Sequence, residues 1–134
     1  MVTAMPSTTR LQWSPQPRVL VVEDDSDIRD VVLLTLDTEG YEAEAAGNGR
    51  VALALLRAWR PHLILLDLMM PEMDGWEYRA RQLADPELAD IPVVVLTAGR
   101  HLRARVDTLR TTAIVPKPFN LDLLLATVRS ITAI

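Results

Sequence analysis

The sequence predicts an α/β fold in which helices cover both faces of a parallel five-stranded sheet, a doubly wound (βα)5 three-layer sandwich. Short, continuous apolar runs, typical of strands buried on both faces, recur along the chain. Longer segments with helical spacing separate these runs, which is the alternation of βα units. The length of 134 residues, with 49% hydrophobic and 24% charged residues, fits one compact domain.

Five strands are expected, and three of them are continuous apolar runs. These three are Val19 to Val22, Leu63 to Leu66 and Val93 to Leu96. Weaker patterns predict two further strands, at Tyr41 to Ala46 and at Ala113 to Val115.

Five helices are expected between and after the strands. The first should begin near Ser26, because Asp25 and Ser26 are good N-cap residues, and it should end at Gly40. Pro61 limits the second, Asp85 and Pro86 close the third, and Asn120 caps the fifth. The predicted inward faces are Ile28, Val31, Val32 and Leu36; Val51, Ala54, Leu55 and Ala58; Trp76, Ala80 and Leu83; Leu102, Val106 and Leu109; and Leu121, Leu124, Val128 and Ile131.

Composition excludes several classes of protein. The first residues, Met1 to Pro17, show no helical or strand period and are predicted to be a disordered tail before a domain spanning 18–134. The absence of cysteine excludes disulfides, thiolate zinc sites and thiol nucleophiles. No apolar run approaches the roughly 20 residues that span a bilayer, so we expect a cytoplasmic protein without a membrane partner. The net charge of -4 gives no overall attraction to nucleic acid, and no direct nucleic-acid partner is expected.

Polar residues follow three of the strands, at the edge of the sheet where ligands bind in this architecture. Glu23 and Asp24 follow the first strand, Asp67 the third and Thr97 the fourth. Helix capping is the simplest role for such acids and suits Asp25, but no helix begins after Asp67. Two carboxylates about 4 Å apart repel by about 4 kcal/mol at an effective dielectric constant near 20, so the cluster needs a cation or a proton. Oxygen ligands without Cys or His favour a hard ion such as Mg²⁺.

The single lysine strengthens this interpretation. Thirteen of the 14 basic residues are arginine, and the remaining one is Lys117, at the end of the fifth strand. A surface lysine without a role is the usual case. Its position at the same sheet edge as the acids favours a chemical role, because a compact ammonium group balances carboxylates and binds phosphoryl groups.

Four stretches, each at a strand end, carry a resemblance to a known family. They are VLVVEDD (19–25), LILLDLMMPEMDG (63–75), VVVLTA (93–98) and KPF (117–119). From Arg18 to its end, the chain resembles the receiver domain of two-component response regulators. The resemblance implies a flavodoxin-like sheet in the order 2-1-3-4-5.

The resemblance also implies a role for each residue of the site. Asp67 would accept a phosphoryl group from a phosphohistidine of a sensor histidine kinase or phosphotransfer protein. Asp24, Asp67 and the main-chain carbonyl of Met69 would bind Mg²⁺, with Glu23 acting largely through water. Thr97 would donate its hydroxyl to the phosphoryl group, and Lys117 would pair with Asp67 at rest. The chain would then be a phosphoacceptor signalling domain, with self-catalysed phosphotransfer and autodephosphorylation, and not a metabolic enzyme.

Ile114 departs from the family pattern, because family members often carry an aromatic residue at that position. Coupling between the acceptor and the outer face therefore cannot use a swinging aromatic ring here. A pseudo-receiver that binds partners without phosphorylation is the alternative function. A flavin-binding domain is a third, but the acids after the first strand would repel its phosphate.

The output partner cannot be named from the sequence. Four arginines make the segment around the fourth helix basic, and they are Arg100, Arg103, Arg105 and Arg110. A solvated helix face is the default interpretation. A partner or homodimer surface formed by helix four, strand five and helix five is the alternative, because the family uses that face.

Overall fold

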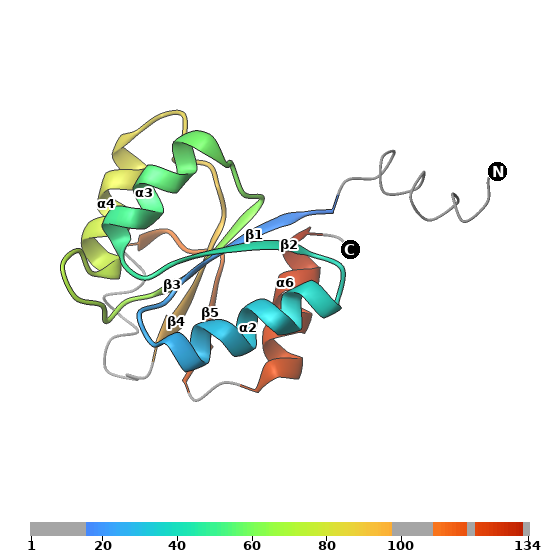
Figure 1. The fold of residues 1–134 in the computed structure, drawn as a ribbon. Coiled ribbons are helices and arrows are strands. Elements are labelled where there is room, and N and C mark those ends of the chain that lie inside the picture. The colour runs from blue at the N-terminus through green and yellow to red at the C-terminus, as the bar shows by residue number, and fades with distance from the viewer. Residues whose placement is uncertain (1–15, 98–108, 118–119, 133–134) are drawn as a thin grey trace.

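The computed structural model of the chain describes residues 16–97, 109–117 and 120–132. Strands and helices alternate as predicted up to the fourth strand, and a helix follows the fifth strand (Figure 1). The elements are β1 (Arg18–Val22), α2 (Ser26–Thr38), β2 (Glu42–Ala46), α3 (Gly49–Ala58), β3 (Leu63–Asp67), α4 (Gly75–Ala84), β4 (Val93–Thr97), β5 (Ala113–Pro116) and α6 (Leu121–Thr132).

The strands form one parallel sheet in the order β2-β1-β3-β4-β5, which confirms the predicted order. Because every neighbouring pair is parallel, the carboxyl ends of the strands lie at the same edge. β2 and β5 are the edge strands, and this explains why Pro116 is tolerated at the end of β5.

Helices cover both faces of the sheet, with α2 and α6 on one face and α3 and α4 on the other (Figure 1). Alternate residues of β3 serve the two cores: Leu63 and Leu65 pack toward α2 and α6, while Ile64 and Leu66 pack toward α3 and α4. Burial on both faces is the reason why these strands read as unbroken apolar runs. The three-layer prediction is therefore confirmed.

Capping groups fix the helix ends where the sequence predicts them. The Asp25 side chain accepts hydrogen bonds from the amides of Asp27 and Ile28 at the start of α2. Gly40 has a positive φ of 95° just after this helix, a conformation that favours glycine. Asn120 caps α6 by accepting from the amide of Asp122 at 2.7 Å.

The predicted inward faces of two helices are wrong. In α3 the buried residues are Gly49, Ala52 and Leu56, while Val51 is exposed. A Cβ at Gly49 would lie 2.9 Å from both the Met73 carbonyl oxygen and the Cβ of Tyr78, so α3 packs too closely here for any side chain.

In α4 polar residues occupy the buried face, which an apolar period cannot reveal. The buried residues are Gly75, Tyr78, Arg79 and Gln82, whereas the predicted Ala80 is exposed and Trp76 and Leu83 are half-buried. Arg79 and Gln82 are buried because their side chains donate hydrogen bonds to backbone carbonyls. In α2 the predicted Val31 is also exposed, although Val32 and Leu36 are buried.

Some predictions fall on other parts of the chain. Residues 1–15 of the predicted tail, Leu102 and Val106 of the predicted fourth helix, and Arg100, Arg103 and Arg105 lie outside the described residues, while Leu109 is buried as expected. The carbonyl of Pro17 accepts a hydrogen bond from the amide of Glu42 at 2.9 Å. Within the described ranges, none of the helices has the length and apolar character needed to cross a bilayer.

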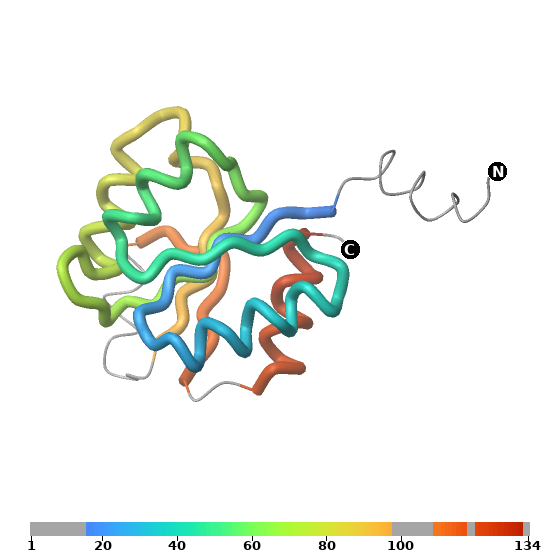
Figure 2. Tube along the Cα trace, viewed as in Figure 1, coloured from blue at the N-terminus to red at the C-terminus, as the bar shows by residue number. Residues whose placement is uncertain are grey.

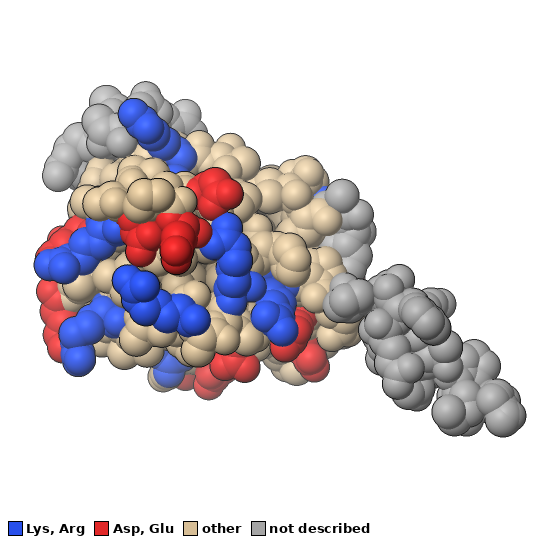
Figure 3. All heavy atoms as spheres, turned by 90° about the horizontal axis from the view of Figure 1, so that it is seen from above, with Lys and Arg blue, Asp and Glu red and all other residues tan. Residues whose placement is uncertain are grey.

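Contacts between helices close the sandwich. α2 and α6 lie side by side on one face (Figure 2), where Arg129 donates to Glu39 and the hydroxyl groups of Tyr41 and Thr132 are 3.1 Å apart. On the opposite face acidic and basic side chains are interspersed (Figure 3). Ion pairs there include Arg57 with Asp85 and Arg81 with Glu77. Such exposed pairs contribute only about 0 to 1 kcal/mol each.

Candidate phosphoacceptor and metal site

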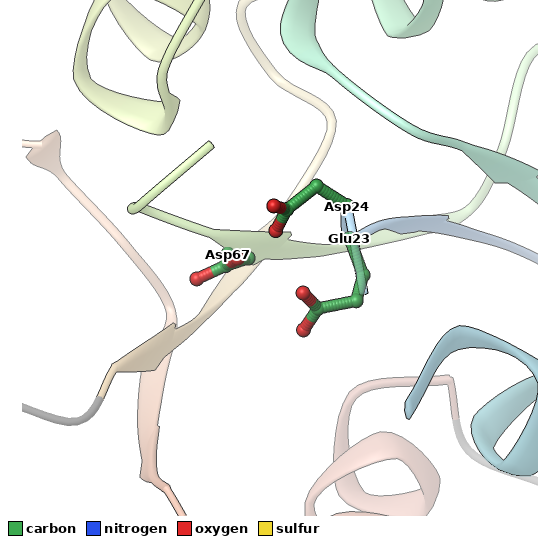
Figure 4. A group of neighbouring side chains, drawn as sticks. All are labelled: Glu23, Asp24 and Asp67. Atoms are coloured by element: carbon green, nitrogen blue, oxygen red, sulfur yellow. The ribbon is translucent and has the colours of Figure 1, made fainter. Parts of the chain in front are cut away.

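Three carboxylates meet beyond the carboxyl ends of β1 and β3 (Figure 4). Glu23 and Asp24 directly follow β1, and Asp67 is the last residue of β3. One carboxylate oxygen from each lies within 4.8 Å of the others, as the sequence predicted for neighbouring strand ends. Glu23 and Asp67 are buried, whereas Asp24 is exposed.

Glu23 is fixed through both its backbone and its side chain. Its amide donates to the Ala46 carbonyl at 3.0 Å, and its carbonyl accepts from Nη1 of Arg29 at 3.2 Å. Its carboxylate accepts from the Asp25 amide at 3.2 Å through Oε2 and from Lys117 Nζ at 2.6 Å through Oε1. The carboxylate is therefore held in one place before any ligand binds.

Asp67 is held by the loop that follows it. Its Oδ1 accepts a hydrogen bond from the amide of Met69 at 3.2 Å and lies 3.4 Å from Lys117 Nζ. The first residue of α4, Gly75, lies directly against the end of β3. A Cβ at Gly75 would be only 2.6 Å from the Asp67 carbonyl oxygen. Only glycine permits this approach.

The remaining predicted residues come from β4 and β5. Thr97 ends β4 and is buried, and its carbonyl accepts from the amide of Lys117 at 2.7 Å. This bond joins the ends of the two strands at the site. The structure thus brings Glu23, Asp24, Asp67 and Lys117 together, with Thr97 on the adjacent strand end.

The charges in the cluster are unbalanced. Burial, which is the largest cause, and the neighbouring Glu23 carboxylate raise the pKa of Asp67 to about 7, although Lys117 and the Met69 amide oppose this change. Burial lowers the pKa of Lys117, but its hydrogen bond to Glu23 and the charges of both carboxylates raise it overall. The cluster thus holds three carboxylates and one ammonium group, which pairs with Glu23 and Asp67, so it favours either a proton on Asp67 or an added cation.

The donor set fits a hard divalent cation. All three side chains offer carboxylate oxygens, and the described residues within reach include no sulfur or imidazole ligand. Mg²⁺ prefers one or two carboxylates together with backbone carbonyls, water and phosphate oxygens. The main-chain carbonyl of Met69, two residues after Asp67, stays a predicted further ligand.

The sequence did not reveal the contacts of two arginines, one at the site and one on α4. Arg29 bonds the Glu23 carbonyl, and Arg79 lies buried on α4. A signal for Arg29 exists, because a basic residue near the N-terminus of a helix opposes the helix dipole and suggests another partner. No such signal exists for Arg79, since it occurs among the polar residues of an amphipathic helix.

Comparison with known proteins identifies the family. The family model described as the response regulator receiver domain matches residues 19–129. The chain is 42% identical over 116 residues to the response regulator MprA of Mycolicibacterium vanbaalenii, covering 85% of this chain and 49% of that protein. It is 37% identical over 117 residues to the DNA-binding dual master transcriptional regulator RpaA of Synechocystis, covering 86% and 48%. The chain therefore spans about half the length of these curated relatives.

Solved structures give the same result. The fold is similar to the chemotaxis response regulator CheY4 of Vibrio cholerae, with a TM-score of 0.80 and 32% identity over 87% of this chain and 98% of that one. It is also similar to a putative response regulator from Chloroflexus aurantiacus, with a TM-score of 0.81 and 26% identity over 89% and 99%. The chain belongs to the response regulator receiver domain family and is a signalling domain of two-component signal transduction.

Proposed function

We propose that Asp67 accepts a phosphoryl group from a phosphohistidine of a sensor histidine kinase or phosphotransfer protein. The observation that carries this proposal is the convergence of three carboxylates, within 4.8 Å of one another, beside a lysine ammonium group. Such a cluster is poorly suited to a purely structural role, because its like charges repel. It is well suited to binding a cation and a phosphoryl group together.

In the proposed transfer the phosphorus–nitrogen bond of the phosphohistidine breaks as a bond forms between phosphorus and a carboxylate oxygen of Asp67. The electron pair of the broken bond stays on the imidazole nitrogen, which takes up a proton. The transition state is loose and its charge is spread over the phosphoryl oxygens, so the chain contributes alignment and charge neutralisation.

Each side chain then has a defined task. The carboxylates of Glu23, Asp24 and Asp67, with the Met69 carbonyl, would hold Mg²⁺, which supplies positive charge to the phosphoryl oxygens. Glu23 also keeps Lys117 at the site through the 2.6 Å hydrogen bond. Lys117 would move its ammonium group from the carboxylates to a phosphoryl oxygen, and Thr97 would donate its hydroxyl to another. The same groups would support self-catalysed transfer from small phosphodonors and later hydrolysis.

The output is proposed to run through the face that contains β5 and α6, which would bind a partner or a second copy of the chain. The RpaA relative is described as DNA-binding. For the present chain, the absence of direct contact with nucleic acid stays a prediction. A binding module independent of phosphorylation is less well supported, because it needs neither the shared lysine nor the acid cluster.

Intact-mass spectrometry after incubation with acetyl phosphate and Mg²⁺ tests the proposal. The wild-type chain should gain the mass of one phosphoryl group, while Asp67→Asn should gain none. Asp90→Asn is the matched control, because Asp90 is an exposed carboxylate paired with Arg60 away from the site. Equal phosphorylation of wild type and Asp67→Asn would refute the assignment.

A further inference from the structure

Arg79 is a buried cation that the proposed transfer does not use. Arg79 is only 3% exposed. Its guanidinium group donates two hydrogen bonds, from Nε to the Leu109 carbonyl at 2.8 Å and from Nη2 to the Arg110 carbonyl at 2.9 Å. Its Nη1 atom is buried without a hydrogen-bond partner, and no carboxylate of the described residues forms an ion pair with it. Two consecutive carbonyls, 30 and 31 residues away in sequence, therefore hold this charge.

A buried guanidinium is costly unless its hydrogen bonds are strong, so these two contacts are an important constraint on the structure. Burial lowers the pKa of Arg79, as expected for a cation without a counter-ion. Arg110, one of the two acceptors, has a left-handed φ of 53°. A conformation that is unfavourable for a side chain of this kind persists only where the surrounding contacts enforce it.

The helix α4 connects the acceptor to the segment that precedes β5. Gly75, the first residue of α4, packs against the backbone of Asp67, and its amide donates to the Leu68 carbonyl at 3.0 Å. Arg79 lies about one turn further along α4. The segment it holds lies beside α4 (Figure 2) and leads into β5, which is followed by Lys117.

We infer that Arg79 is a positioning residue that couples the phosphorylation state of Asp67 to the position of the 109–112 segment and β5. This inference rests on the proposed function. Ile114 stands where the family often has an aromatic residue and is half-buried against the core next to α3 and α4. A swinging ring is thus absent, and the α4–Arg79 contact offers a different mechanical link between the acceptor and the β5 face.

Hydrogen exchange followed by mass spectrometry on the full chain tests the coupling, with and without acetyl phosphate and Mg²⁺. Arg79→Met removes the donors while keeping an apolar stem of similar length. Arg81→Met is the matched control, because Arg81 lies two residues further on the same helix and forms an exposed pair with Glu77. The readout is the change in exchange on phosphorylation across peptides covering 109–117, alongside the intact mass.

Arg79→Met should gain phosphoryl mass like wild type, but should lose most of the phosphorylation-dependent change in 109–117. The Thr112 amide donates to the Val93 carbonyl at 2.9 Å. In unphosphorylated Arg79→Met this amide should exchange about tenfold faster than in the unphosphorylated wild type. Arg81→Met should behave like wild type. A full phosphorylation-dependent change in Arg79→Met would overturn the inference and leave the proposed function standing.

Two further outcomes are distinguishable. A wild-type chain that gains no phosphoryl mass would overturn the proposed function and, with it, the coupling. Should Arg79→Met fail to fold, Arg79→Lys keeps the charge but has a single ammonium group in place of the two-pronged donor. Arg79→Lys should then show a partial loss of the change, and an undiminished change in that variant would contradict the coupling.

Discussion

The ammonium group of Lys117 is shared between two buried carboxylates, with Nζ 2.6 Å from Oε1 of Glu23 and 3.4 Å from Oδ1 of Asp67. The shorter contact is to the glutamate and not to the proposed acceptor. Glu23 thus keeps the only lysine of the chain at the site while leaving Asp67 the less firmly bound of the two carboxylates. An acceptor that must attack phosphorus benefits from this arrangement.

Removing the shared charge should destabilise the protein. Lys117→Met leaves Glu23 and Asp67 buried beside each other without a cation, so the free energy of unfolding at pH 7 should fall by roughly 2 to 3 kcal/mol. Urea denaturation followed by circular dichroism measures this change. Mg²⁺ should recover more stability in Lys117→Met than in wild type. An unchanged denaturation midpoint would show that the ion pairs of Lys117 with Glu23 and Asp67 contribute nothing to the free energy of unfolding.

Stability of the metal-free protein should fall as the pH rises from about 4 to about 7. The pKa of Asp67 is about 7 in the folded protein, against 3.8 for an ordinary aspartate, so in this range the folded chain binds the proton more strongly than the unfolded chain. Raising the pH therefore favours unfolding. Denaturation in the presence of a chelator at several pH values should show this slope in wild type, while Asp67→Asn should lack its contribution. Identical slopes in the two proteins would contradict the pKa assignment.

Mg²⁺ should raise the thermal midpoint, because a ligand that binds the folded state stabilises it. At 100 times the dissociation constant the gain is about 2.7 kcal/mol. Asp24→Asn should weaken or abolish this gain. Asp25→Asn is the control, because Asp25 caps α2 and asparagine caps a helix equally well. The metal account fails if both variants respond to Mg²⁺ like wild type.

The phosphorylated state should be long-lived. Met69 is two residues after Asp67 and is 69% exposed. A thioether cannot orient an attacking water by hydrogen bonding as an amide does. Met69→Asn should speed phosphate loss severalfold without preventing phosphorylation, as intact-mass time courses would show. Equal rates of loss would mean that this position does not control the lifetime.

The fold could be predicted from the sequence because the central strands are buried on both faces and carry unbroken apolar runs, as in Leu63 to Leu66. The convergence of the carboxylates could be predicted because Asp67 ends such a run without starting a helix. The inward faces of α3 and α4 could not, since a glycine and polar side chains fill positions that apolar residues usually occupy. Arg79 is the clearest case, because its burial depends on carbonyls 30 and 31 residues away.

Locating the phosphoryl group tests the central claim most directly. The chain would be phosphorylated with acetyl phosphate and Mg²⁺, the acyl phosphate trapped by reduction, and the modified peptide sequenced by mass spectrometry. The account predicts modification at Asp67 alone and none when Mg²⁺ is chelated. Modification at Glu23 or Asp24 in place of Asp67, or undiminished modification without the metal, would contradict it.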